Sequence, residues 1–388
     1  MNGSEPERHR LAALLVSQGV LTSPWLREAV ETMPREQFLH PGVFLDEGRN
    51  WRPVTALGTA SDEWSKIAYS VDTLTTQLDG HLTADQVGEP VAGVPTSSST
   101  DPTTVVGMIE ALDLTAGHRV LEIGTGTGYS TALMCHYLGE DNVTTIEVDP
   151  QVAARADAAL EAVGHSTWTM TGDGLLGHPR RAPYDRVIAT CAVRRIPHTW
   201  IRQTRPGGII LSTVGSWPWG TGLAKVTVGD DGTAEGAIIG RSSFMQARAQ
   251  AATPLAGDLS ARTAYADSER IALLSPLVLE EWMPAFLAQL AVPGAQFVRA
   301  TDGDGSLLRY LFDAERESFA EFVAADGGRW TVRQGGPVAL WDDVERSLVA
   351  WQDAGLPEIE SVRLRVTPAS HRYWIDQVPS LCWEHRIT

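Results

Sequence analysis

A short run of alternating glycines is the strongest chemical signal in this sequence. It lies in VLEIGTGTGYS, residues 120–130, between an apolar stretch that predicts a strand and a stretch with helical spacing. Glycine lets the backbone turn sharply and lets a ligand approach the main chain, and the first N–H groups of a helix are free to donate hydrogen bonds. The spacing is Gly-x-Gly-x-Gly, which differs from the Gly-x-Gly-x-x-Gly of dinucleotide-binding loops. The run therefore predicts a nucleotide-type binding turn.

Three carboxylates accompany this loop. Glu122 lies in the strand before the glycines, and such an acidic, Gly-rich strand end resembles motif I of class I S-adenosylmethionine (SAM) methyltransferases. Glu147 ends the next predicted strand and Asp173 follows the third, where that fold places acceptors for the ribose hydroxyls and the adenine amino group. Each charge-assisted bond of this kind contributes about 1.5–3 kcal/mol. Taken singly, Glu147 also fits a solvated strand end, and Asp173 a turn residue before Gly174.

Four segments narrow the resemblance. They are MPREQFLHP (33–41), VLEIGTGTGYS (120–130), PYDRVIATCAV (183–193) downstream of GDG, and RPGGIILSTVG (205–215). Their combination is similar to the protein-L-isoaspartate O-methyltransferase family over roughly residues 10–230. The resemblance implies methyl transfer from SAM to a carboxylate of isoaspartate or aspartate in a polypeptide, with S-adenosylhomocysteine as the product. It assigns cofactor binding to Glu122, Gly124, Thr125, Gly126, Gly128, Tyr129, Glu147, Val148, Gly172, Asp173 and Gly174.

A hydroxyl-rich segment precedes the first helix of the expected SAM-binding region. In the family, a Thr-x-Ser-x-x-Pro-like segment there brings a hydroxyl to the substrate carboxylate, and here the stretch is PTSSSTDP, residues 95–102. The resemblance assigns substrate binding to Ser97 and catalysis to a hydroxyl group of the set Ser98, Ser99 and Thr100. Asp101, which is followed by a proline, also fits the N-cap of that helix.

Further features concern the substrate. A long insertion precedes residue 96, and residues 230–388 extend past the usual end of the family. With the SSST segment, these features are similar to an actinobacterial subset found beside ribosomally made, modified peptides, including FxLD-type lanthipeptide systems. The preferred hypothesis is therefore methylation of an Asp in such a peptide, leading through the ester to a succinimide, and the alternative is general repair of isoaspartyl proteins. Trp217 and Trp219 are expected either to contact the substrate or to pack in a core.

The order of the expected elements indicates how these residues are positioned. Helices expected at 7–19 and 24–33 precede a weakly patterned stretch, residues 42–99. A strand is expected within AYSVDTLTTQL, residues 68–78, and the stretch is otherwise predicted to be a long loop. From residue 102 helices and strands alternate, which predicts a parallel sheet covered on both faces. The expected fold class is α/β, a Rossmann-like class I SAM-dependent methyltransferase with an additional C-terminal α+β domain, in which residues 317–325 are helical. The expected domains are residues 1–100 (N-terminal helices and substrate-side insertion), 101–230 (SAM-binding core) and 231–388 (accessory domain for substrate recognition).

Composition restricts the partners. The 388 residues carry 31 basic and 48 acidic side chains, so the net charge is 31 − 48 = −17. This lacks the cationic surplus that phosphate neutralisation needs, which disfavours nucleic acid, and a cationic or small peptide segment would bind more easily. The family resemblance implies a peptide or protein as the substrate. Neither an N-terminal signal pattern nor an apolar run of membrane-spanning length is present, so a cytoplasmic protein without membrane contact is expected.

The cysteines and histidines do not indicate a metal site. The three cysteines fit no disulfide or metal pattern and are expected to be buried, and the histidines have no metal-ligand spacing.

Overall fold

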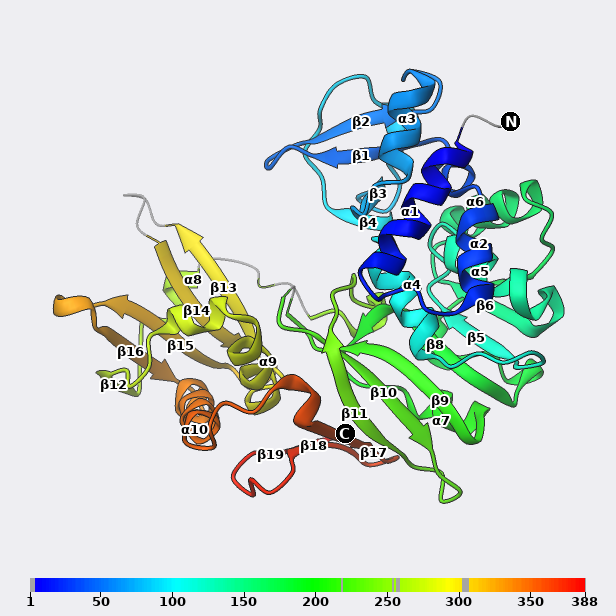
Figure 1. Cartoon of the computed structure of the whole chain (residues 1–388). Coiled ribbons are helices and arrows are strands. Elements are labelled where there is room, and N and C mark those ends of the chain that lie inside the picture. Colours follow the sequence, from blue (N-terminus) through cyan, green and yellow to red (C-terminus); the bar gives the residue numbers. More distant parts are fainter. Residues whose placement is uncertain (1–3, 218, 253–254, 256–258, 302–306, 388) are drawn as a thin grey trace. The chain divides into compact units, whose positions relative to one another are not determined.

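The computed structural model describes residues 4–217, 219–252, 255, 259–301 and 307–387, which form two compact units (Figure 1). Unit 1 comprises Met1–Cys191, Thr199–Leu211 and Thr227–Gly232, and unit 2 comprises Ala192–His198, Ser212–Val226 and Thr233–Thr388. Strands β8 (Tyr184–Val193), β9 (Thr204–Val214) and β10 (Gly222–Val228) contribute residues to both. Parts of unit 2 thus precede residue 230, and the expected division into three domains stays a prediction.

A parallel sheet forms the centre of unit 1. Strand β5 pairs in parallel with β6 and with β8, and β6 pairs in parallel with β7. Its inner strands β5 and β6 are buried along their whole length, as a sheet covered by helices requires. This confirms the α/β core that the alternating pattern predicts. The bounds are α4 (Pro102–Ala111), β5 (Val120–Ile123), α5 (Tyr129–Leu138), β6 (Val143–Glu147), α6 (Pro150–Ala162), β7 (Trp168–Thr171) and α7 (His198–Gln203).

The N-terminal part of unit 1 contains a small antiparallel sheet where the sequence predicts a long loop. Its strands, in the order β2-β1-β3-β4, have only five residues each, so residues 42–99 show little periodicity although they fold. Phe44 and Leu78 are buried beside Ala84 in a core of their own, which a loop would lack. The loop prediction is therefore wrong for β1, β2 and β4, whereas β3 confirms the strand expected within residues 68–78. The bounds are α1 (Glu5–Ser17), α2 (Pro24–Thr32), the 3₁₀ helix η1 (Arg35–Leu39), β1 (Gly42–Asp46), β2 (Trp51–Thr55), α3 (Ser61–Ala68), β3 (Leu74–Leu78) and β4 (Pro95–Ser99).

Unit 2 contains an antiparallel sheet of the described strands in the order β12-β16-β15-β14-β13. Residues 317–325, which the sequence predicts to be helical, form β15 instead, because Phe319 and Phe322 favour a strand and β15 pairs on both sides. The remaining bounds are β11 (Ala234–Arg241), α8 (Leu259–Arg262), β12 (Ser268–Ile271), α9 (Trp282–Ala291), β13 (Gln296–Thr301), β14 (Leu307–Asp313), β15 (Ser318–Ala324), β16 (Trp330–Gly335), α10 (Leu340–Asp353), β17 (Val362–Val366), β18 (Ser370–Ile375) and β19 (Cys382–Arg386).

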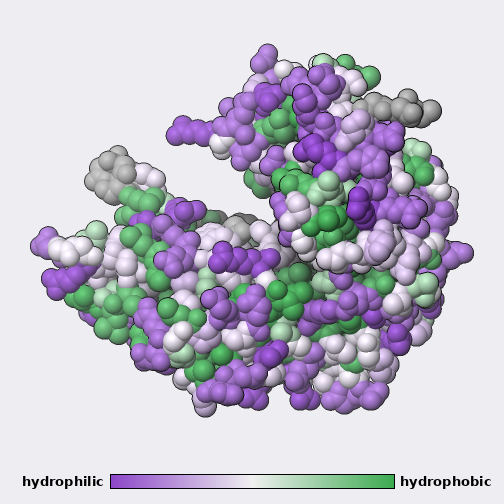
Figure 2. All heavy atoms as spheres, viewed as in Figure 1, coloured by the Kyte–Doolittle hydropathy of each residue, from purple (hydrophilic) through white to green (hydrophobic). Residues whose placement is uncertain are grey.

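The surface is largely polar. Figure 2 shows hydrophilic side chains over much of the visible face, with smaller hydrophobic patches between them. Across the described ranges, no helix is both long and apolar enough to cross a membrane.

The cysteines differ in their exposure. Cys135 is buried, but Cys382 is exposed on β19, where side chains alternate between the interior and solvent. The expectation of three buried cysteines is therefore confirmed at Cys135 and wrong at Cys382, and Cys191 is partly exposed.

Candidate active site

The Gly-rich loop joins β5 to α5 and turns through left-handed backbone. Gly124, Gly126 and Gly128 have φ values of +91°, +55° and +89°, which side-chain-bearing residues rarely adopt. A Cβ on Gly124 would lie 2.8 Å from Thr190 Oγ1. The Gly124 N–H donates to the Ile146 carbonyl at 2.8 Å, which ties the loop to the end of β6. The glycines are therefore required by the shape of this turn.

Glu122 supports the loop from inside. Its carboxylate is fully buried and accepts hydrogen bonds from the hydroxyls of Ser130, Thr131 and Thr145. Burial raises the pKa of this carboxyl group, and the three hydroxyls counteract that rise. Thr125, also buried, bonds to the Thr145 hydroxyl at 2.7 Å. Glu122 thus holds the loop and the start of α5 in place, and its direct contact with a cofactor stays a prediction.

Glu147 ends β6 and also contacts the loop. Its Oε2 accepts from the Gly126 N–H at 3.0 Å, and its Oε1 accepts from the Asp149 N–H at 3.0 Å. Asp149 in turn caps α6 by accepting from the N–H of Gln151. The carboxylate predicted to bind ribose is thereby fixed beside the glycines.

The ends of β6 and β7 present surface that fits an adenosine group. The side chain of Val148 is 44% exposed, and a Cβ on Gly172 would meet nothing within 4 Å. Asp173 is exposed, and its Oδ1 accepts from the Leu175 N–H at 2.9 Å. Gly174 packs tightly, because a Cβ there would lie 2.4 Å from Ile123 Cγ2. An apolar side chain, open space and a carboxylate are what a purine with an amino group requires, so these residues fit SAM.

The hydroxyl-rich segment lies on β4 and at its end. Ser97 is buried and accepts from the Thr76 hydroxyl at 3.1 Å, whereas Ser98 and Thr100 are partly exposed. The Ser98 carbonyl oxygen would be 3.6 Å from a Cβ on Gly126. The fold thus brings the predicted catalytic segment next to the predicted cofactor loop. Asp101 caps α4 through the Thr103 N–H at 2.8 Å, which confirms the N-cap interpretation for that residue.

A buried arginine holds this segment from behind. Arg35 is 0% exposed, and its guanidinium donates to the Ala68 and Ser70 carbonyls at 2.8 and 2.9 Å. It also donates to Ser99 Oγ at 3.3 Å and to the Thr100 carbonyl at 3.2 Å. Among the described residues it makes no ion pair with a carboxylate. The sequence analysis includes Arg35 only as one residue of the MPREQFLHP segment. Its burial and bonding could not be predicted, because its partners lie more than thirty residues away in the sequence.

Tyr129, the first residue of α5, links that arginine to the loop. Its ring lies 5.9 Å from the Arg35 guanidinium carbon and contacts Phe38 edge to face. Burial raises the pKa of the Tyr129 hydroxyl to about 12, so this group is neutral at physiological pH. Tyr129 was predicted to bind the cofactor, and the structure places its side chain in this interior cluster.

A cavity of about 330 Å³ opens in unit 1 at the same place. It is bordered by the loop residues Gly126 and Thr127 on one side and by Ser97 and Thr76 on another. Sequence reasoning named Ser97 and Gly126 but missed the walls, because a lining set by packing has no local sequence signal. These walls come from η1 and α6 and include Gln37, Phe38, His40, Val152 and Arg155.

Trp217 and Trp219 lie in unit 2. Trp217 is 2% exposed and donates its indole N–H to the Ala295 carbonyl at 2.7 Å. Trp219 donates to the Leu279 carbonyl at 2.9 Å, and both rings pack on Phe297. These contacts fit the core-packing alternative, and contact with a substrate stays a prediction.

Comparison with known proteins gives a consistent result. Residues 84–245 match the model of the family described as protein-L-isoaspartate(D-aspartate) O-methyltransferase. Protein-L-isoaspartate O-methyltransferase of Ignicoccus hospitalis is 38% identical over 148 residues, which are 38% of this chain and 69% of the relative. Protein-L-isoaspartate O-methyltransferase 1 of Anaeromyxobacter sp. is 43% identical over 133 residues, 34% of this chain and 62% of the relative. A solved structure titled protein-L-isoaspartate O-methyltransferase aligns with a TM-score of 0.54 and 22% identity over 95% of this chain and 99% of its own.

The parallel sheet, its glycine turn and the carboxylates at successive strand ends define a class I SAM-dependent methyltransferase. Within that class, the chain belongs to the protein-L-isoaspartate(D-aspartate) O-methyltransferase family. The matches to these two relatives cover 38% and 34% of the chain, and the family model matches residues 84–245.

Proposed function

We propose that this protein transfers a methyl group from SAM to the free carboxylate of an isoaspartyl residue in a polypeptide. The observation that carries the proposal is the approach of the Ser98 main chain to the Gly126 turn. This approach puts the hydroxyl-rich end of β4 next to the loop that fits the cofactor. Family membership supports the same assignment.

The chemistry suits a site with few ionisable groups. SAM supplies a methyl group bonded to a positively charged sulfur. A substrate carboxylate is ionised at neutral pH, since its ordinary pKa is about 4, and it needs no general base to act as the nucleophile. The protein's task is therefore to orient that carboxylate and to exclude water. We assign orientation to the hydroxyls of Ser98 and Thr100, which are the partly exposed members of the segment.

The product explains why methylation serves repair. An ionised carboxylate is a poor electrophile because it carries a negative charge, whereas the methyl ester is neutral and can release its methoxy group. The following backbone nitrogen therefore attacks the ester carbonyl and gives up its proton to the departing methoxide. A five-membered succinimide forms and methanol leaves. Water then opens the ring to aspartate or isoaspartate, and repeated cycles enrich the ordinary aspartate.

The narrower hypothesis names a ribosomally made, modified peptide as the substrate and an ordinary Asp as the methylated residue. It depends on the insertion before residue 96 and on the C-terminal region. A solved structure titled protein-L-isoaspartate O-methyltransferase, however, aligns with 95% of this chain, so the fold of the C-terminal region also occurs in a protein of that name. The comparisons therefore support isoaspartate repair better than peptide maturation.

Paired peptides distinguish the two hypotheses. Two unstructured peptides of identical sequence, one with isoaspartate and one with aspartate, are incubated with the full chain and SAM. We expect methyl ester only on the isoaspartyl peptide. Methylation of neither peptide, combined with methylation of an Asp in a cross-linked peptide, would instead support maturation.

A further inference from the structure

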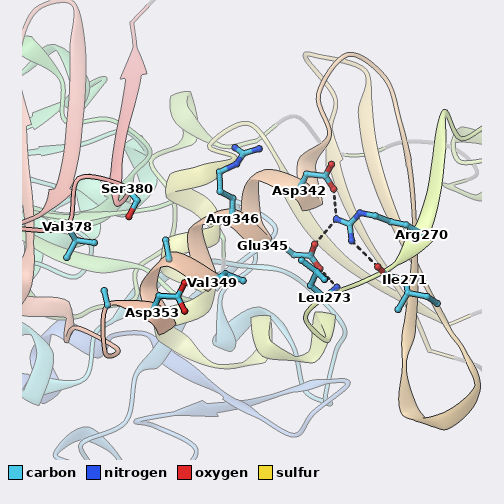
Figure 3. A pocket seen from close by; sticks show the side chains of 12 residues that line it. Arg270, Ile271, Leu273, Asp342, Glu345, Arg346, Val349, Asp353, Val378 and Ser380 are labelled. Carbon is cyan, nitrogen blue, oxygen red and sulfur yellow. Dashed lines mark hydrogen bonds and ion pairs between the residues drawn. The ribbon is translucent and has the colours of Figure 1, made fainter.

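A groove of about 770 Å³ lies within unit 2, between the edge of its five-stranded sheet and helix α10 (Figure 3). One wall is a single face of α10, because its lining residues recur at helical spacing. The opposite wall comes from β12 and the residues just after it, and a third side from the loop before β19. The α10 residues that line the groove are Asp342, Glu345, Arg346, Val349, Ala350 and Asp353.

The groove has an apolar part that is open to solvent. Ile271 and Leu273 are 45% and 77% exposed, and Val349 of α10 and Val378 of the loop line the same groove (Figure 3). Exposed apolar side chains that gather in a concave surface mark binding sites more often than isolated ones do. The volume of the groove accommodates several side chains.

The sheet edge beside the groove offers main-chain hydrogen bonds. Among the strands that the structure describes, β12 is the outer one of its sheet and pairs with β16 alone. An extended segment can therefore add to β12 as a further strand and place alternate side chains into the groove. This geometry favours a polypeptide over a compact small molecule.

The net charge of the groove favours a positively charged occupant. Arg270 is already paired with Asp342 and Glu345, and Arg346 is paired with Asp343. Among the described residues, the side-chain carboxylate of Asp353 has neither an ion pair nor a hydrogen bond. Two arginines against four carboxylates, with Asp343 included, leave 2 − 4 = −2 at this surface. A lysine or arginine on the occupant complements that charge.

We propose that this groove binds an extended segment of the polypeptide substrate that carries apolar side chains and at least one lysine or arginine. The inference rests on the proposed function in one respect, namely that the substrate is a polypeptide. It adds a second contact with the substrate, made by unit 2, to the contact at the methylated residue. Such a contact raises the affinity for long substrates and leaves short ones unaffected.

The direct test measures binding to the full-length protein. The probe is a fluorescein-labelled peptide of seven residues that alternates valine with lysine, and its matched control has glutamate at every lysine. We expect the basic probe to bind and the acidic one not to. Val349→Asp should weaken binding about tenfold or more, since it places a charge among apolar contacts. Asp353→Asn should weaken it about two- to fivefold, as expected for one exposed ion pair. Glu360→Gln, an exposed change outside the groove, is the control.

Kinetics connect the groove to turnover. The basic probe should inhibit methylation of a long isoaspartyl protein and should leave methylation of a short isoaspartyl peptide unchanged. Absence of probe binding, equal binding of both probes, or binding that ignores Val349→Asp would overturn the proposal. Concentration-dependent self-association of the chain that Val349→Asp abolishes would overturn it too, because a second copy would then occupy the groove. If the short peptide is not methylated at all, the proposed function fails instead, and probe binding still decides whether the groove takes a peptide.

Discussion

The guanidinium of Arg35 donates a hydrogen bond to Ser99 Oγ at 3.3 Å from a position with no solvent exposure. The same nitrogen bonds to the Thr100 carbonyl, and the other terminal nitrogen bonds to two carbonyls near the end of α3. The Arg35 side chain therefore joins the end of β4 to the residues at the end of α3. Arg35 is a positioning residue, since it acts on the substrate through the segment that it holds.

Replacing this arginine should separate its positioning role from cofactor binding. Arg35→Lys keeps a positive charge but cannot reach four acceptors, so we expect the free energy of unfolding to fall by about 2–4 kcal/mol. In the folded fraction, kcat for an isoaspartyl peptide should fall about tenfold or more while the Kd of SAM changes little. Calorimetric titration and initial rates measure the two effects.

Ser99→Ala is the matched control, because it removes only the serine end of this contact. We expect it to lower the free energy of unfolding by about 1 kcal/mol. A purely structural role for Arg35 would be shown by an unchanged kcat in the folded Arg35→Lys protein.

The hydroxyls should matter for methyl transfer and not for the cofactor. Replacing Ser98, Ser99 and Thr100 together by alanine should lower the rate about 10²-fold or more, with SAM affinity nearly intact. The single variants refine this result: Ser98→Ala and Thr100→Ala should carry most of the loss, because Ser99 is buried and already bonded to Arg35. A triple variant with wild-type kcat would remove the catalytic role.

The Gly-rich turn should determine SAM affinity. Gly124→Val should abolish measurable binding, since the left-handed backbone and a Cβ position 2.8 Å from Thr190 Oγ1 both oppose a side chain. Gly139→Ala is the control: its φ of +81° imposes the same backbone strain, but nothing lies within 4 Å of its added Cβ. We expect Gly139→Ala to be destabilised and to bind SAM normally. Asp173→Ala should also weaken SAM binding, through loss of an acceptor.

A histidine pair in unit 2 should make stability depend on pH. Burial lowers the pKa of His371 from 6.5 to about 4, with further lowering from His385 and Arg195, and its Nε2 contacts the Ile196 carbonyl. Between these two pH values the unfolded chain binds a proton that the folded chain does not, so stability falls as the pH drops through this window. One such group contributes a slope of about 1.4 kcal/mol per pH unit.

Denaturant unfolding at several pH values measures that slope. His371→Gln should flatten it between pH 6.5 and about pH 4. His385, whose pKa burial also lowers, should account for part of what remains. An identical slope in wild type and His371→Gln would contradict the assignment.

The sequence predicted the parts of this molecule whose signals are local. The glycine turn, the alternation after residue 102 and the Asp101 cap all depend on neighbouring residues, and the structure has each of them. Of the short strands between residues 42 and 99, β3 lies in a segment that the sequence predicts to be a strand. Strands β1 and β2 escaped prediction because five residues show little periodicity, and β4 because its partner β3 is distant in sequence. Strand β15 was mistaken for a helix because its pairing with β14 and β16 outweighs local spacing.

The site shows the same division. Residues predicted around the cofactor follow strand ends, which sequence reveals, and the fold places Glu147 and Gly126 in contact. The sequence does not reveal that Glu122 supports the loop from the interior. Its carboxylate oxygens accept hydrogen bonds from three hydroxyls on α5 and β6, which only the folded chain brings together. Arg35 was missed for a similar reason, since its four bonds join segments that only the folded chain brings together.

The central claim is methyl transfer to the isoaspartyl carboxylate next to the Gly126 turn. The measurement that tests it most directly is intact-mass analysis of an isoaspartyl peptide, with its aspartyl counterpart alongside, after incubation with the full chain and SAM. The account predicts an added methyl group on the isoaspartyl peptide alone, with one S-adenosylhomocysteine formed per ester and loss of both signals in the Ser98, Ser99 and Thr100 triple alanine variant. An unmodified isoaspartyl peptide in the presence of wild-type protein that binds SAM would contradict it.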